Sequence, residues 1–372
     1  MYPPDEGDNV PSTFITQPGL GEDGIFDLSD ANSGSHEAVR LCVDSATGLR
    51  AIVALHSTSR GPALGGTRFF PYKDETAALR DVLRLSEGMT FKAAAAGLPL
   101  GGGKAVIIGD PEALKTPELL RAYGRFVDSF GGSYITAADV GTTSADMDFI
   151  GESTVRVVGR NMTHGGSGDS GYSTASGVFC AMTAAANYVW GATGLRGRAV
   201  GVEGAGKVGS QLIRLLLDAG AEVVLAEPHA ETMSRAAETY PNIRVRGSVV
   251  DAEVDVYAPC AMGGTLNADT VRTVRARIVC GAANNQLHTP EMEYQLRAHG
   301  ILWVPDYIAN AGGLIQVASE IDVITPDEVA GRIDHIALTV MEMLRISEER
   351  NMTPGDAADA MVRGRLGTGA RG

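Results

Sequence analysis

The stretch RAVGVEGAGKVGSQLIRLLLDAGAEVVLAE, residues 198–227, decides the fold. A β-branched run ends at three glycines in the pattern G-x-G-x-x-G, and an apolar helical stripe follows directly. In such a strand–loop–helix unit the first glycine permits a tight turn, the second lets a pyrophosphate approach the backbone, and the third lets helix and strand pack closely. Phosphates would meet the N-terminus of the helix, where backbone N–H groups point outward. The stretch therefore predicts the start of a doubly wound, dinucleotide-binding domain.

An acidic residue follows the second strand of this unit. Glu227 stands 18 residues after Gly209, where a carboxylate would accept a hydrogen bond from the ribose 2′-hydroxyl. The same carboxylate would repel a 2′-phosphate, and no arginine immediately follows it, so NAD is favoured over NADP. The alternative is a glycine-rich turn without a ligand. The candidate cofactor contacts of the loop are Gly204, Ala205, Gly206, Lys207, Val208 and Gly209.

Strand-like and helical runs continue to alternate after this unit, at 255–259, 278–281 and 301–306, and the last 50 residues are mostly helical in pattern. We expect an α/β protein of two domains with a cleft between them. Residues 166–324 would form a Rossmann-type NAD-binding domain. Residues 34–165 would form an α/β substrate domain, completed by C-terminal helices over 325–372. Residues 1–33, rich in Pro, Gly, Asp and Ser, would be a flexible arm.

The N-terminal half begins with a predicted hairpin, 37–44 and 49–57. A glycine-rich loop over 61–70, a helix over 74–96 and a buried strand over 104–109 follow. A further helix is expected at about 116–130 and a short strand at 134–137. This half therefore carries its own mixture of strands and helices.

Two lysines of this half lie in unusually apolar surroundings. Lys92 stands in an almost uncharged stretch, and Lys104 lies between GGG and AVII. A lysine is ordinarily a solvated surface residue, but one that cannot reach water either pairs or loses its proton. Such a lysine suits either general acid/base work or the binding of a carboxylate.

Polar side chains follow three other predicted strands. Asp139 comes directly after the strand at 134–137, a usual position for a catalytic group in an α/β fold. Asn284 and Asn285 follow the strand at 278–281, and PDYIANAGG (305–313) follows the next one. Asparagines there could bind a carboxamide or an amine, although asparagine and glycine also favour turns without any ligand.

Composition excludes several classes of function. Lys plus Arg number 31 and Asp plus Glu 45, a net charge of −14, which disfavours nucleic acid as a partner. No apolar run is long enough for a membrane helix, and the first residues lack a signal-peptide pattern. The four cysteines are far apart and suit a reducing, cytoplasmic compartment, and the seven histidines show no metal-ligand spacing. GDSG (168–171) matches a serine-protease segment, but that fold is all-β.

Nine segments together resemble the superfamily of glutamate, leucine, phenylalanine and valine dehydrogenases. They are GPALGGTR (61–68), MTFK (89–92), GLPLGGGKAVI (97–107), TAADVGT (136–142), SADMD (144–148), GAGKVG (204–209), APCAMGG (258–264), GAANNQL (281–287) and PDYIANAGG (305–313). They lie in the family's order over about residues 50–320. HSTSRGPALGGTRFFPY, YGRFV and CGAANNQL are most similar to the actinomycete valine dehydrogenases.

The resemblance implies a role for individual residues. Lys104 would be the catalytic lysine, Asp139 its acid/base partner and Lys92 the anchor of the substrate carboxylate. Asn285 would contact the substrate amino group and Gly65 would lie at the substrate. The side-chain pocket would include Leu64, Ala137, Leu314 and Val317. Beyond the glycine loop, the NAD site would include Arg68, Thr174, Glu227, Pro259, Cys260 and Asn284.

The implied reaction is the reversible, NAD-dependent oxidative deamination of an L-amino acid to its 2-oxo acid and ammonium. The pocket residues are uncharged, so glutamate is disfavoured, and Leu64 and Leu314 fill space, so valine or another branched-chain substrate is expected, in amino-acid catabolism. A phenylalanine dehydrogenase and a non-catalytic NAD sensor are the alternatives. Family resemblance and the apolar hairpin both suggest a homo-oligomer.

Overall fold

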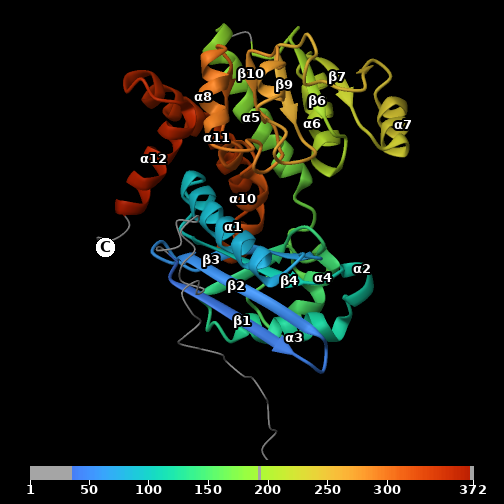
Figure 1. The fold of residues 1–372 in the computed structure, drawn as a ribbon, viewed down its shortest axis with the longest axis vertical. Helices are drawn as coiled ribbons and strands as arrows, with labels where there is room; N and C mark the ends of the chain where they lie inside the picture. Colours follow the sequence, from blue (N-terminus) through green and yellow to red (C-terminus); the bar gives the residue numbers. More distant parts are fainter. Residues whose placement is uncertain (1–35, 192–193, 369–372) are drawn as a thin grey trace, which may run out of the picture. The chain divides into compact units, whose positions relative to one another are not determined.

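The computed structural model describes residues 36–191 and 194–368, so the arm predicted over residues 1–33 lies outside it. Contacts divide the described chain into two units. The first holds the residues up to Thr90 together with Gly101–His164, and the second holds Phe91–Leu100 together with the residues from Gly165 onward. Each unit has its own sheet with helices beside it (Figure 1), so the predicted α/β class and the presence of two units are confirmed.

The first unit is built on a five-stranded mixed sheet in the order β1-β2-β4-β3-β5. Its strands are β1 (Ala38–Asp44), β2 (Leu49–Ser57), β3 (Ala63–Phe70), β4 (Gly101–Ile108) and β5 (Tyr134–Ala138). The predicted hairpin is present as the antiparallel pair β1 and β2. β3 lies between β4 and β5 and is parallel to both.

α1 (Glu75–Ala95) packs on one face of this sheet, and α3 (Pro117–Asp128) with α4 (Ser144–Gly151) packs on the other. The last turn of α1 belongs to the second unit. The first unit also contains α2 (Pro111–Leu114) and the 3₁₀ turn η2 (Met162–His164). Alternate residues of β2 point to opposite faces. Val53 and Leu55 pack in the cluster that contains α3, whereas Ile52 and Ala54 pack against Val82 and its neighbours on α1.

The glycine-rich segment at 61–70 is a strand and not the predicted loop. Gly65 and Gly66 lie within β3, where backbone hydrogen bonds to both neighbouring strands replace those a loop would make to water. A Cβ on Gly65 would overlap the carbonyl oxygen of Gly103, and one on Gly102 would overlap the backbone of Thr90. The glycines therefore serve the close approach of β3, β4 and α1.

The second unit contains a six-stranded parallel sheet in the order β11-β10-β9-β6-β7-β8. The strands are β6 (Ala199–Glu203), β7 (Glu222–Ala226), β8 (Arg244–Val245), β9 (Val256–Pro259), β10 (Ile278–Val279) and β11 (Leu302–Trp303). This order is that of a doubly wound dinucleotide-binding sheet, with the switch point between β6 and β9. The short exposed strand β8 had no predicted counterpart.

Helices cover both faces of the parallel sheet, as in other doubly wound folds. They are α5 (Gly171–Trp190), α6 (Lys207–Asp218), α7 (Ala230–Thr239), η3 (Thr270–Arg272), α8 (Glu291–Ala298), α9 (Asp306–Ala309), α10 (Gly312–Asp322), α11 (Pro326–Glu349) and α12 (Pro354–Thr368). Val200 and Val202 of β6 face the cluster formed by α5, α6 and the C-terminal helices. Tyr257 and Val279 face the opposite cluster with α8.

The C-terminal helices differ from the expectation that they complete the first domain. α11 and α10 pack against α5, and the buried residues of α11 and α12 share one core with β6. α12 also holds the last turn of α1, which belongs to the same unit: Arg365 Nη1 donates to the carbonyl oxygens of Ala94 at 3.2 Å and Ala95 at 2.8 Å. The helical pattern of these residues was predictable, but the surface that receives them is formed by distant segments. No helix in the described part of the chain is long and apolar enough to cross a membrane.

Candidate active site

The first unit holds a partly buried ion pair between Lys104 and Asp139. β4 carries Lys104, and Asp139 follows the last residue of β5. Lys104 Nζ donates to Asp139 Oδ2 at 2.6 Å, and the lysine side chain is only 7% exposed. The two sequence-predicted catalytic residues, 35 positions apart, are therefore in direct contact. A close lysine–carboxylate pair that is largely out of water is suited to moving a proton between its two members.

The surroundings of Asp139 keep it ionised. Burial opposes ionisation, but the charges of Lys104 and Arg68 and their hydrogen bonds outweigh it and lower the pKa of Asp139 to about 2. The backbone N–H of Asp139 donates to Thr142 Oγ1 at 2.9 Å, and Thr142 Oγ1 donates to the carbonyl of Thr67 at 2.8 Å. The turn after β5 is thus fixed, and at neutral pH Asp139 is an oriented anion.

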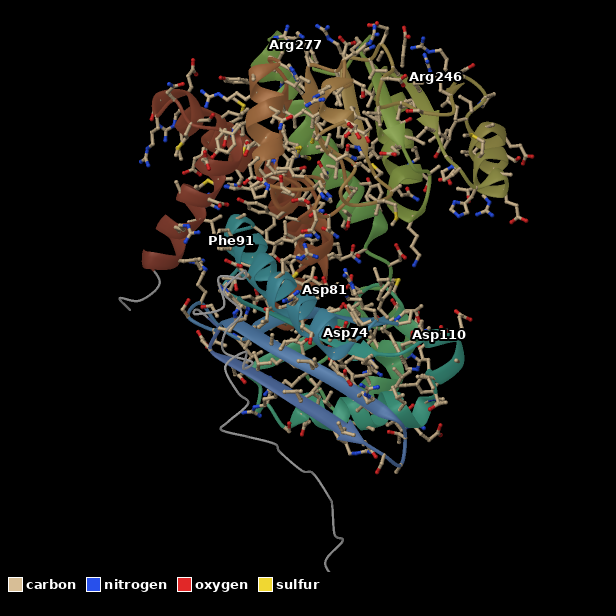
Figure 2. The ribbon with its side chains drawn as sticks, viewed as in Figure 1. Asp74, Asp81, Phe91, Asp110, Arg246 and Arg277 are labelled. Atoms are coloured by element: carbon tan, nitrogen blue, oxygen red, sulfur yellow. The ribbon has the colours of Figure 1, made fainter. Side chains whose placement is uncertain are left out.

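Arg68, a predicted cofactor contact, lies at this pair. Its Nε donates to Asp139 Oδ2 at 3.2 Å, and its Nη1 donates to Asp81 Oδ2 at 2.8 Å. Asp81 lies on α1 (Figure 2) and was not among the predicted site residues. The guanidinium therefore links two carboxylates of the first unit.

The glycine loop of the second unit fits a dinucleotide pyrophosphate. Gly204 has φ +94°, a conformation that favours glycine, and a Cβ on Gly209 would overlap the carbonyl oxygen of Gly204. Gly206 is the N-cap of α6 without a side-chain cap, and a Cβ there would meet no atom within 4 Å. The space beside Gly206 therefore leaves room for a phosphate at the N-terminus of α6, the end of a helix that favours anions.

Glu227 lies at the carboxyl end of β7 beside this loop. Its Oε2 accepts the backbone N–H of Ala205 at 2.8 Å, and its Oε1 accepts the N–H of His229 at 2.9 Å. Although burial opposes ionisation, these hydrogen bonds and His229 lower the pKa of Glu227. Glu227 is therefore an anion in contact with the glycine loop, in the position where a ribose hydroxyl is bound in doubly wound folds.

Three other predicted cofactor contacts belong to the same unit. A Cβ on Gly209 would lie 3.5 Å from Cβ of Cys260, and Cys260 N donates to the carbonyl of Glu203 at 2.8 Å. Pro259 ends β9, the strand beside β6. Thr174 lies in the first turn of α5, whose Gly171 approaches the backbone of Lys207. The start of α5 and the end of β9 thus both adjoin the glycine loop.

The two asparagine-containing segments meet in the second unit. Asn310 Nδ2 donates to Asn284 Oδ1 at 2.7 Å, and Gln286 N donates to Asp306 Oδ2 at 3.3 Å. Asn285 is exposed with φ +53°, so its side chain is presented by a turn in the left-handed region. The interpretation of these asparagines as turn residues is therefore correct for the backbone of Asn285 and leaves its side chain available.

Lys92, the predicted carboxylate anchor, is half-buried in the last turn of α1. Its charge acts on Asp306, which is buried at the start of α9; burial raises the pKa of Asp306 and Lys92 opposes that shift. Asp306 was missed in the sequence because an aspartate after a proline reads as an ordinary helix start. Its burial, which the sequence does not show, distinguishes it.

The predicted pocket residues are divided between the units. Leu64 and Ala137 are buried in the first unit, on β3 and β5, and Gly65 adjoins Leu64. Leu314 is buried on α10 of the second unit, and Val317 lies half-buried one turn later. None of the five carries a charge.

Among the residues that the structure describes, no group of three or more His, Cys, Asp or Glu side chains could hold a metal ion.

Comparison with known proteins identifies the family. Residues 36–156 match the Glu/Leu/Phe/Val dehydrogenase dimerisation domain, and residues 225–361 match the Glutamate/Leucine/Phenylalanine/Valine dehydrogenase domain. The chain belongs to the Glu/Leu/Phe/Val dehydrogenase family. The resemblance noted in the sequence is therefore confirmed, and the protein is an amino-acid dehydrogenase of a family that uses NAD or NADP. This membership leaves the protease pattern without support, and its Ser170 is simply the residue before α5.

Three relatives show how far the similarity extends. A valine dehydrogenase of Streptomyces virginiae is 47% identical over 92% of this chain and 97% of its own. A phenylalanine dehydrogenase of Caldalkalibacillus thermarum is 43% identical over 90% of this chain and 92% of its own. The crystal structure of an L-tryptophan dehydrogenase from Nostoc punctiforme matches with a TM-score of 0.79 and 39% identity, over 91% of this chain and 97% of its own.

Proposed function

We propose that this family member catalyses the reversible, NAD-dependent oxidative deamination of aliphatic L-amino acids, with valine as the preferred substrate. The observation that carries the proposal is the partly buried Lys104–Asp139 ion pair, with 2.6 Å between Nζ and Oδ2, in a chain whose other unit has an open glycine loop. A non-catalytic NAD sensor would need only the loop. A close lysine–carboxylate pair has a clear use in proton transfer and none in sensing NAD.

Bound nicotinamide dinucleotide supplies the acceptor for the hydride that leaves the substrate Cα. The protein's own residues then act on the iminium that remains. In its neutral form, Lys104 Nζ takes a proton from water as the water adds to the iminium carbon. Asp139 Oδ2, in contact with Nζ, receives and returns that proton so that the amino group departs as ammonia and the 2-oxo acid forms. Exclusion of bulk water protects the hydride step.

The substrate's common atoms are assigned to two residues of the second unit. Lys92 would bind the α-carboxylate, and Asn285 would contact the amino group. Support comes from the half-buried lysine charge beside Asp306 and from the exposed amide of Asn285 on a fixed turn. Both groups are complementary in charge or hydrogen bonding to atoms that every L-amino acid shares.

The choice of NAD over NADP is assigned to Glu227. Its carboxylate is an anion beside the glycine loop, so a 2′-phosphate placed there would meet a like charge. Thr174, Pro259, Cys260, Asn284 and the loop residues 204–209 would complete the cofactor site.

The choice of substrate side chain is assigned to Leu64, Ala137, Leu314 and Val317. None of the four can pair with a charge, and a charged group buried without a partner is costly, so glutamate is disfavoured. Two of the four are leucines, which favours an aliphatic side chain over an aromatic ring. Phenylalanine is the second candidate substrate, because a phenylalanine dehydrogenase is nearly as similar to this chain as the valine dehydrogenase.

We further propose a cytoplasmic homo-oligomer whose partners are small molecules, with no nucleic acid or membrane among them. Leu41 is 48% exposed and Val43 69% exposed on the edge strand β1, within the segment that matches a dimerisation domain. A second copy covering β1 would bury these side chains and pair the edge of the strand that, among the described residues, faces away from β2.

The direct test follows NADH absorbance with a panel of L-amino acids and each dinucleotide. We expect kcat/KM for valine, leucine or isoleucine to exceed that for phenylalanine, and activity with NAD⁺ to exceed that with NADP⁺. Equal use of NADP⁺ would contradict the role of Glu227. Turnover of none of the amino acids would refute the proposed function.

A single variant separates the two substrate candidates. Leu314→Ala should move the ratio of kcat/KM toward phenylalanine by about tenfold, since a change of this size in an apolar pocket is worth about 1–3 kcal/mol. Leu338→Ala, which truncates a leucine that is 59% exposed on α11, is the matched control and should leave the ratio unchanged. An unchanged ratio in Leu314→Ala would show that Leu314 does not select the substrate side chain.

A further inference from the structure

Asp139 is held by a second cation besides Lys104. Arg68 Nε donates to Asp139 Oδ2 at 3.2 Å, the same oxygen that Lys104 Nζ contacts at 2.6 Å. Arg68 Nη1 donates in turn to Asp81 Oδ2 at 2.8 Å. Charge therefore alternates along Lys104, Asp139, Arg68 and Asp81, and none of these side chains is more than 21% exposed.

Asp81 is itself held on three sides. Besides Arg68, Tyr72 Oη donates to Asp81 Oδ2 at 2.6 Å, and Arg84 Nη2 donates to Oδ1 at 2.9 Å. These contacts and the charge of Arg68 outweigh burial and lower the pKa of Asp81. Asp81 is thus an oriented anion on α1 that fixes one end of the Arg68 guanidinium and leaves the other end on Asp139.

Proton transfer at Lys104 gives the contact between Arg68 and Asp139 a function. During proton transfer Lys104 alternates between an ammonium ion and a neutral amine. In the neutral form Lys104 no longer stabilises the Asp139 carboxylate by charge. An arginine stays charged throughout the accessible pH range, and in a partly buried site its field is poorly screened by salt.

We propose that Arg68 is a positioning residue that orients the Asp139 carboxylate and favours its ionised form, so that a proton received from Lys104 is readily returned, and that Asp81 holds Arg68 for this purpose. The inference rests on the proposed function, which assigns the proton transfer to Lys104 and Asp139. It differs from the dinucleotide contact that the family resemblance implies for Arg68. A dinucleotide contact predicts a changed KM for NAD⁺, whereas a positioning role predicts a changed pH profile once both substrates are saturating.

The first test measures kcat against pH at saturating amino acid and NAD⁺. In Arg68→Gln the lost cation favours the proton on the Lys104–Asp139 pair. The rise of kcat with pH should therefore move to higher pH by about one unit, the lower end of the effect of a charge at this range. Arg68→Lys keeps the charge and should move it by less than half as much. Arg121→Gln is the matched control on α3, an arginine also paired with two carboxylates, and should leave the profile unchanged.

The second test changes Asp81, the carboxylate at the other end of the row of alternating charges. Asp81→Asn keeps an oxygen that accepts the hydrogen bond from Arg68 but removes the negative charge that partly neutralises it. The kcat profile should therefore move to lower pH, opposite to Arg68→Gln. This variant carries the test if Arg68→Gln does not fold, as judged by circular dichroism.

Two results would overturn the inference. One is a raised KM for NAD⁺ in Arg68→Gln with an unmoved pH profile. The other is a profile in Asp81→Asn that stays in place or moves to higher pH. Failure of the proposed function is separate, since then the wild-type protein forms no NADH. The carbon-13 carboxyl titration of Asp139, identified by its loss in Asp139→Asn, still decides the point: its midpoint must rise in Arg68→Gln, and an unmoved midpoint refutes the role of Arg68.

Discussion

Glycine is used in opposite ways in the two units. In the first, Gly65 and Gly102 lie in strands where a Cβ would overlap backbone atoms of a neighbouring element. In the second, Gly206 faces open space at the N-terminus of α6. The first use brings strands and a helix close enough to enclose the Lys104–Asp139 pair, and the second leaves room for a phosphate. Abundant glycine therefore indicates close approach, and only the position in the fold tells whether protein or ligand approaches.

The largest expected effect is on turnover and belongs to the first unit alone. Lys104→Ala should lower kcat by about 10²–10⁴-fold, the usual contribution of a general acid/base group. The Kd for NAD⁺, measured by fluorescence titration, should stay within error because the glycine loop belongs to the second unit. Lys115→Ala, which removes a lysine paired with Asp146 at 2.9 Å, is the control and should retain turnover. A near-normal kcat in Lys104→Ala would refute the assignment of Lys104 as a catalytic residue.

Filling a packed glycine should cost folding stability. Gly65→Ala places a methyl group on the carbonyl of Gly103, so β3 and β4 must separate, and we expect a loss of about 3 kcal/mol in the free energy of unfolding. Gly88→Ala, in α1 with no atom within 4 Å of its Cβ, is the control and should be neutral or slightly stabilising. Equal stability of the two variants in urea unfolding would contradict the packing role.

Acid should remove the stabilisation that comes from the Lys104–Asp139 ion pair of the first unit. The pKa of Asp139 is about 2 in the folded protein, below its ordinary value of 3.8, so its ionisation stabilises the fold above pH 3.8 and this contribution is lost as pH falls through 2. The difference is worth about 2 kcal/mol. Between pH 5 and pH 2 the wild-type protein should therefore lose about 2 kcal/mol more stability than Asp139→Asn. Parallel curves for the two proteins in pH-dependent urea unfolding would mean that the pair adds no net stability.

Filling the open glycine should affect only the ligand. Gly206→Ala puts a methyl group where the pyrophosphate is expected, and we predict about a tenfold rise in the Kd for NAD⁺, or about 1.4 kcal/mol, without a change in melting temperature. Gly331→Ala on α11, whose Cβ would also meet no atom, should leave the Kd unaltered. A lower melting temperature with unchanged affinity would show that Gly206 serves packing as Gly65 does.

The smallest effect concerns a place where the backbone favours glycine and the sequence has valine. Val323, after α10, has φ +52° and is 87% exposed. A left-handed conformation costs a β-branched residue about 1–2 kcal/mol. Glycine removes this strain, but it loses more conformational entropy on folding, which offsets part of the gain. Val323→Gly should therefore stabilise the protein by about 0.5–1 kcal/mol in thermal unfolding. Val155→Gly, at a site that is 85% exposed with ordinary φ, should destabilise it instead.

The sequence predicted the second unit better than the first. The strands of a parallel sheet are covered on both faces and form short apolar runs, and G-x-G-x-x-G is a local pattern with a local cause. β3 was predicted as a loop because its glycines are turn-prone, and the pairing with β4 and β5 that makes it a strand comes from distant residues. The direction in which α11 and α12 pack was missed for the same reason.

The charged residues of the site in the first unit were predicted only in part. Lys104 and Asp139 stood out as charged groups among apolar or small residues, and the structure brings them into contact. Asp81 did not stand out, because it lies on a helix with Arg80, Arg84 and Glu87 and has the spacing of an ordinary solvated face. Only the fold shows that it faces Arg68. Buried electrostatic partners on amphipathic helices escape sequence patterns, which record residue type and not the direction in which a charge points.

The hydrogen bonds from Arg365 to the end of α1 also bear on the order in which the chain folds during synthesis. Residues 91–100 are synthesised among those of the first unit but pack with the second. The α12 residue that donates to their carbonyl oxygens, Arg365, is made some 270 positions later. Domains generally fold as units while the chain emerges. The first unit has all of its residues by position 164, yet the stretch it brackets can complete these contacts only after residue 365 has been synthesised. Until then the carbonyl oxygens of Ala94 and Ala95 lack the donor that Arg365 supplies.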